Sequence, residues 1–136
     1  MLPFLLVMAF TLLSLLHIHW LFGGRWGKAV AVPEQNGRPA FTPSRFATAL
    51  VAIGLADCAA LVAALAGWLP LPVGAGILRT MGFAVALLFL ARAIGDFRLV
   101  GFFKRVQGTA FATWDTWLFS PLCLLLALAF FFIAAS

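Results

Sequence analysis

The sequence is poor in charge. Only 10% of its 136 residues are charged, whereas a water-soluble domain carries about 25%. So few charged side chains cannot solvate a globular surface, which excludes a soluble fold. Long apolar runs exclude a disordered chain, and two cysteines are too few for a disulfide framework. With 65% hydrophobic residues and a mean hydropathy of +1.12, the chain is typical of a small membrane protein with several spans.

Four apolar segments are each long enough to cross a bilayer, for which a helix needs roughly 20 residues. Because the apolar residues run continuously instead of alternating with polar ones, they predict helices and not a membrane β-barrel. We therefore predict one all-α membrane domain over residues 1–136, an antiparallel up-down bundle of four transmembrane helices at about residues 2–22, 43–68, 76–95 and 115–135. The first segment lacks a basic leader and a small-residue cleavage site, so we expect it to be retained.

Pro121 lies about six residues inside the fourth predicted helix. A proline at such a position removes one backbone hydrogen bond, so it predicts a kink. The alternative is a shorter helix capped by Ser120, with residues 109–120 lying along the membrane interface.

Basic residues are concentrated on one side of the predicted bundle. Eight of the nine Lys and Arg residues fall in or beside the loops 23–42 and 96–114, whereas Arg79 alone lies on the opposite side. The positive-inside rule then places both loops in the cytoplasm and both termini on the outer, non-cytoplasmic side. We expect these loops to contact anionic lipid headgroups, with residues 98–106 lying in the interface. Nucleic acid is not an expected partner, because the charge is divided between two loops.

Each predicted helix carries an ionisable group in its cytoplasmic half. Asp57 is near the middle of its helix, where a charge costs about 2.5–3.5 kcal/mol and a short carboxylate cannot reach the headgroups. We therefore expect a polar pocket in the cytoplasmic half, with Asp57 and His17 as its titrating groups. Snorkelling arginines and a histidine that serves only in packing are the alternative interpretation. The predicted pocket residues are His17, Trp20, Asp57, Arg92, Asp96, Arg98 and Asp115.

The sequence predicts no metal site and no cofactor. His17 and His19 are two residues apart, so they point to opposite sides of a helix and cannot both bind one metal ion. A haem held by two histidines would need them on facing helices. Cys58 and Cys123 form no Cys-x-x-Cys motif.

Two motif blocks make the chain similar to a known family. The first runs from His17-Ile-His-Trp20 to Gly23-Gly24-Arg-Trp26-Gly27, and the second comprises Arg92-Ala-Ile-Gly95-Asp96-Phe-Arg98, Gly101-Phe-Phe-Lys104-Arg105, Asp115 and Ser120-Pro121. Together they resemble the small bacterial four-helix membrane proteins described only as a domain of unknown function. The resemblance implies a multi-pass protein of the bacterial inner membrane and brings no activity, substrate or cofactor with it.

Three functional hypotheses follow. The favoured one is a role in binding or transporting a small ligand or protons through the predicted pocket. The second is an accessory subunit that packs against a larger membrane complex through the Phe-rich fourth helix. Ala59, Ala63 and Gly67 recur every four residues, which predicts close helix packing within the bundle, with a homodimer seam as the alternative. A membrane enzyme acting on a lipid or isoprenoid is the least favoured, because no nucleophile or metal motif is present. In it, His17 or Asp96 would be the acid–base group, and Arg92 or Arg98 would hold an anionic head.

Overall fold

The computed structural model describes all 136 residues and is almost entirely helical. Four of its helices are long and apolar enough to cross a membrane, which confirms the all-α fold class with four spans. They are α1 (Leu2–Leu21), α3 (Arg45–Leu65), α4 (Ala75–Ile94) and a composite fourth helix over Ala110–Ala135.

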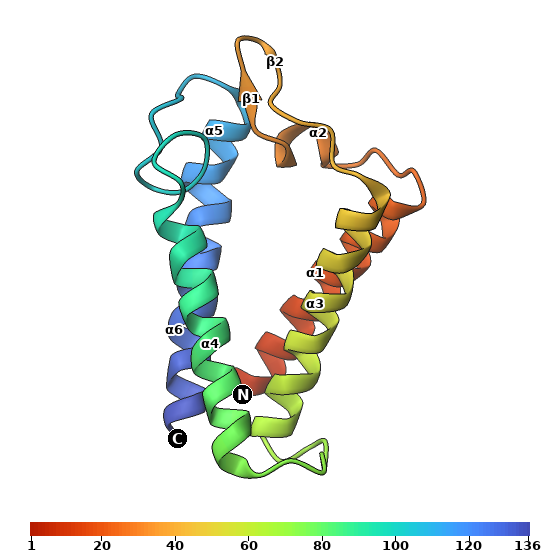
Figure 1. Cartoon of the computed structure of the whole chain (residues 1–136), viewed down its shortest axis with the longest axis vertical. Helices are drawn as coiled ribbons and strands as arrows, with labels where there is room; N and C mark the ends of the chain where they lie inside the picture. The colour runs from red at the N-terminus through yellow and green to blue at the C-terminus, as the bar shows by residue number, and fades with distance from the viewer.

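The four long helices form two pairs that spread apart like the arms of a V. Helix α1 packs along α3, and α4 packs along the fourth helix. Figure 1 shows the pairs converging at the end where both termini lie and separating toward the opposite, wide end. Which of these ends faces the cytoplasm stays a prediction.

The apolar core lies where the two pairs converge. Phe10 of α1 is fully buried there, with its ring centroid 5.5 Å from that of Phe89 and 5.4 Å from that of Phe130. Ala59 packs against the same core, so this member of the small-residue series contributes to packing inside the bundle. The convergent end is therefore closed by packed side chains.

Helix α3 is shorter at both ends than the predicted segment 43–68. It begins at Arg45 because Ser44 is the N-cap, with a hydroxyl that accepts a 3.0 Å hydrogen bond from the backbone N–H of Ala47. It ends at Leu65, and Gly67 then takes a positive φ of 75° that turns the chain toward α4.

The fourth helix is longer than predicted and contains an irregular turn. It comprises α5 (Ala110–Trp114), a π-helical turn η1 (Asp115–Phe119) and α6 (Ser120–Ala135). The π turn ends two residues before Pro121, whose ring and missing N–H disturb regular α-helical bonding. The alternative in which Ser120 caps a shorter helix is wrong, because Ser120 has helical dihedral angles inside a continuous span.

Short elements cover the wide end of the V. Helix α2 (Lys28–Ala31) is followed by a hairpin of β1 (Glu34–Gln35) and β2 (Arg38–Pro39), whose turn residues Asn36 and Gly37 both have positive φ. Both α2 and β1 contact α5, so these elements bridge the two helix pairs (Figure 1).

Candidate functional site: an ionic cluster and an apolar cleft

Asp115 is the centre of an ionic cluster in the pair formed by α4 and the fourth helix, near the wide end of the V. Its side chain is fully buried, and Oδ1 accepts a 2.7 Å hydrogen bond from Nη2 of Arg92. Oδ2 accepts from the backbone N–H of Gly101 at 2.8 Å and from the hydroxyl of Ser120 at 3.2 Å, and it lies 3.1 Å from Nζ of Lys104. We call these five residues the Asp115 cluster.

Lys104 is the second buried charge of the Asp115 cluster. Its ammonium group donates to the carbonyl of Gly101 at 3.0 Å and to the hydroxyl of Thr116 at 2.7 Å, in addition to the ion pair with Asp115. Three acceptors match the three protons of an ammonium group. Lys104 therefore lies inside the protein and not in the membrane interface as predicted.

Two glycines allow the loop after α4 to fold back over the Asp115 cluster. Gly95 and Gly101 have φ values of 92° and 90°, and a Cβ at either position would collide with the carbonyl of Val100 or Ile94, respectively. The backbone N–H of Phe102 then bonds to the carbonyl of Ala93 at 2.8 Å. This close contact brings Lys104 back to the helix.

Asp96 organises the same loop from outside. Its Oδ1 accepts from the backbone N–H groups of Arg98, Leu99 and Val100 at 2.9, 2.7 and 3.0 Å. Although desolvation acts in the opposite direction, these N–H groups hold the pKa of Asp96 below its usual value. Asp96 and Arg98 are both exposed, so this predicted pair belongs to a surface turn.

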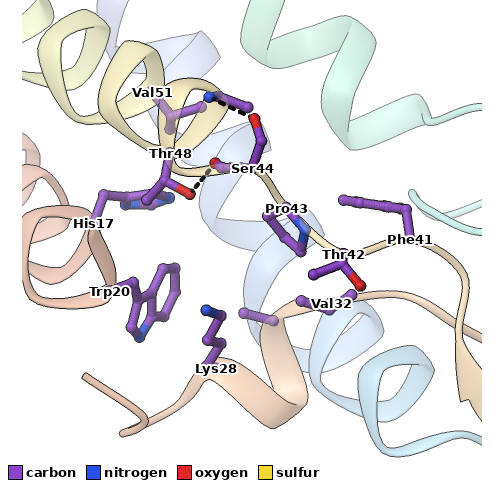
Figure 2. Close-up of a pocket in the computed structure, with 12 residues that line it drawn as sticks. His17, Trp20, Lys28, Val32, Phe41, Thr42, Pro43, Ser44, Thr48 and Val51 are labelled. Carbon is purple, nitrogen blue, oxygen red and sulfur yellow. Dashed lines mark hydrogen bonds between the residues drawn. The ribbon is translucent and has the colours of Figure 1, made fainter. Parts of the chain in front are cut away.

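A cavity of about 450 Å³ lies between the end of α1, helix α2 and the start of α3. Figure 2 shows His17 and Trp20 on the α1 side of this cavity, with Lys28 and Thr48 contributed by α2 and α3. The His17 and Trp20 rings meet edge to face at 4.8 Å, and the Trp20 indole N–H donates to the carbonyl of Trp26 at 2.7 Å. The aromatic wall is therefore fixed from two sides.

The tautomer of His17 follows from its one hydrogen bond. Its Nδ1 lies 2.8 Å from the carbonyl oxygen of Leu13, and a carbonyl can only accept, so Nδ1 carries the proton. In the neutral ring, Nε2 is then the acceptor that another group can use.

A second cavity of about 300 Å³, the interpair cleft, lies between the two helix pairs. It shares His17 and Trp20 with the first cavity and is otherwise almost wholly apolar, with walls that include Phe111 and Cys123. Arg92 is the only Lys, Arg, Asp or Glu in its lining. The Asp115 cluster thus presents its guanidinium to an apolar space.

The predicted pocket residues fall into three groups in the structure, one of which is the surface turn of Asp96 and Arg98. His17, Trp20 and Arg92 line the interpair cleft together, and Asp115 lies behind Arg92 as its ion-pair partner. Asp57 is not brought to this cleft: it lies exposed on α3 and makes no hydrogen bond or ion pair. The structure places no group of three His, Cys, Asp or Glu side chains where they could hold a metal ion.

Lys28 and Lys104 contribute to these sites but were not among the predicted residues. Lys104 stands between Phe103 and Arg105, and a mixture of aromatic and basic residues is also typical of loops in the membrane interface. Its distance of eleven residues from Asp115 gives no periodic signal, because an irregular loop joins them.

Four long apolar helices around a cleft with a cationic wall define a multi-pass membrane protein. The chain belongs to the family described as "Protein of unknown function (DUF3995)", whose model matches residues 10–130. The match confirms the predicted membership of a family of unknown function. No curated protein and no solved structure matches the chain.

Proposed function

We propose that this membrane protein binds a small amphipathic anion, with the anionic head against Arg92 and the apolar body in the interpair cleft. The observation that carries the proposal is that the Arg92 side chain, although Nη2 is paired with Asp115, stays 33% exposed and lines the cleft. The Asp115 cluster has two cations and one carboxylate, so one positive charge remains unbalanced. An anionic oxygen against the exposed part of the guanidinium would balance that charge.

His17 supports an anionic head from the opposite wall of the cleft. Its Nδ1–H is bonded to the carbonyl of Leu13, which leaves Nε2 for a ligand. Because Nε2 is free of partners within the chain, His17 can form a hydrogen bond with the polar head of a ligand. Lys28 adds a third cation at the adjoining cavity.

The dimensions and walls of the two cavities support a ligand with an apolar body. Their volumes of about 450 and 300 Å³ lie in the range of small-molecule sites, roughly 300–1,000 Å³. The packed cluster around Phe10 closes the convergent end of the bundle. These features favour a binding site over an open channel.

The location that we propose is the bacterial inner membrane, with the wide end of the V at the cytoplasmic side. Arg25, Lys28, Arg38 and Arg45 all lie at or near this end, which supports that orientation under the positive-inside rule. The ligand would then enter from the cytoplasm or from the inner leaflet.

Equilibrium binding to the protein in nanodiscs of zwitterionic lipid tests the proposal. The probes are radiolabelled dodecanoate, dodecyl phosphate as an anionic competitor and dodecanol as the uncharged match. We expect both anions to compete and dodecanol to fail, because only an anion can pair with Arg92. Arg92→Gln should weaken dodecanoate binding about tenfold or more, whereas Arg79→Gln, at the other end of α4, should leave it unchanged.

A cavity-filling variant separates loss of binding from loss of folding. Ala31 lines both cavities and is not one of the five residues of the Asp115 cluster, so Ala31→Trp should block the ligand while the melting temperature stays near that of the wild type. Competition by dodecanol equal to that by dodecyl phosphate, or full dodecanoate binding by a folded Ala31→Trp variant, would overturn the proposal.

A further inference from the structure

Asp57 lies at the depth in α3 where a carboxylate is hardest to accommodate. At 1.5 Å per residue it is about 18 Å from the first residue of the helix and about 12 Å from the last. An aspartate side chain is far too short to reach an interface over either distance. Asp57 is nevertheless exposed on the surface of the bundle, with no hydrogen bond or ion pair within the chain.

The residues around Asp57 form one continuous face of α3. Leu50, Ile53, Gly54 and Asp57 are spaced three and four residues apart, so they share a helix face, and all four are exposed. We call this set the outer face of α3. One turn further along α3, Leu61 continues the same stripe and is buried in the core, so the outer face is limited to the exposed stretch from Leu50 to Asp57.

The shape of the outer face suits a second helix. A Cβ built at Gly54 would meet no atom within 4 Å, so the backbone of α3 is open to close approach one turn from Asp57. Beside Ile53, a shallow cavity of about 200 Å³ runs between α3 and α1, lined by small residues such as Ala49 and Ala56. Side chains of a packed helix can enter such a groove.

Charge complementarity selects the occupant. In the apolar part of a bilayer, an ionised carboxylate requires a cation. Arg92 and Lys104 of this chain are already paired with Asp115, and its other basic residues lie near helix ends or in loops. The nearest unpaired basic residue within a span is Arg79, which lies close to the start of α4, so a second copy of this chain offers no Lys or Arg whose backbone lies as deep as Asp57.

We propose that the outer face of α3 docks a transmembrane helix of a different membrane protein, which places a Lys or Arg side chain against Asp57. Gly54 permits the close helix contact, and Leu50 and Ile53 supply its apolar surface. The site is separate from the interpair cleft, so docking and ligand binding can succeed or fail independently.

Resonance energy transfer in liposomes between the labelled protein and synthetic transmembrane peptides tests the docking. The peptides are Leu/Ala helices that carry Lys, Leu or Asp at the central position. We expect the central-Lys peptide to associate with the wild type and to bind Asp57→Asn about tenfold or more weakly. Gly54→Leu should also weaken it by steric blocking, whereas Asp96→Asn, which changes an exposed carboxylate outside the spans, should not.

A charge exchange makes the assignment specific. Asp57→Lys should lose the central-Lys peptide and gain the central-Asp peptide, which a merely structural effect on α3 would not produce. Equal association of the central-Leu and central-Lys peptides would overturn the proposal. Energy transfer between two copies of the protein that is lost in Asp57→Asn would also overturn it and assign the face to a homodimer.

Discussion

Asp115 and Asp57 are both aspartates in apolar helical segments, yet their surroundings differ completely. The carboxylate of Asp115 is fully buried and contacts Arg92, Lys104, Gly101 and Ser120. The carboxylate of Asp57 is exposed and contacts no polar group of the chain. The first aspartate therefore contributes to the stability of this fold, whereas the second is available to another molecule.

The difference arises from the segments next to each aspartate. Asp115 lies near the end of its span, where Gly95 and Gly101 let a loop fold back and deliver Lys104. Asp57 lies in mid-helix, too far from any loop for a basic side chain to reach it. The loop that turns back after α4 thus supplies the buried carboxylate of Asp115 with its second cation, Lys104.

The largest effect that we expect is from Asp115→Asn. The substitution leaves Arg92 and Lys104 without a counter-charge in a buried setting, and breaking such a pair costs about 3–5 kcal/mol. Unfolding of the purified protein by sodium dodecyl sulfate in mixed micelles, followed by circular dichroism, measures the change. A loss no larger than that of Asp57→Asn would contradict the structural role of the cluster.

Lys104→Met should have the second largest effect. It removes a fully buried ammonium group and leaves Thr116 and the Gly101 carbonyl without their donor, at a cost of about 1–3 kcal/mol. Arg105→Met is the matched control, since the adjacent Arg105 is exposed. The same unfolding assay should show little change in the control, and equal losses in the two variants would place Lys104 at the interface after all.

The position of Lys104 shows which features of the structure could not be predicted from the sequence. Composition and run length are sufficient to predict four helices, because span length is set by bilayer thickness. The ends of α3 differ from the prediction by a few residues, since Ser44 and the turn at Gly67 decide them locally. The pairing of Lys104 with Asp115 was not predictable, because it depends on an irregular loop.

The site prediction shows the same division between periodic and irregular structure. His17 and Arg92 lie near the same end of their helices, so their common depth followed from counting residues. The rotation of α3 could not be obtained in this way, because small and apolar residues surround Asp57 on every side. In the structure, α3 is rotated so that Cys58 is buried in the bundle and Asp57 is exposed on its surface.

Asp96→Ala should have a smaller effect that depends on pH. Three backbone N–H groups lose their acceptor, at a cost of about 0.5–1 kcal/mol by analogy with a lost helix cap. Because the pKa of Asp96 is lowered in the folded state, its contribution is complete above the unfolded value near 3.9 and is lost as the pH falls through the folded value. The stability difference between wild type and variant should therefore be constant from neutral pH to about 5 and shrink below about 4. Asp96→Asn keeps an acceptor oxygen but cannot ionise, so its stability difference from the wild type should be smaller than that of Asp96→Ala at neutral pH and should also shrink below about pH 4.

Asp57→Asn should have the smallest effect on the isolated protein. The carboxylate makes no contact within the chain, and surface substitutions usually change stability by less than about 0.5 kcal/mol. The asparagine substitution is the same as the one at Asp115, so unfolding of both variants in the same micelles compares the two aspartates directly. A loss of several kcal/mol for Asp57→Asn would mean that Asp57 has a partner inside the bundle, and the distinction between the two aspartates would fail. If Asp57→Asn leaves the free energy of unfolding nearly unchanged but abolishes association with the central-Lys peptide, Asp57 serves in docking and not in folding.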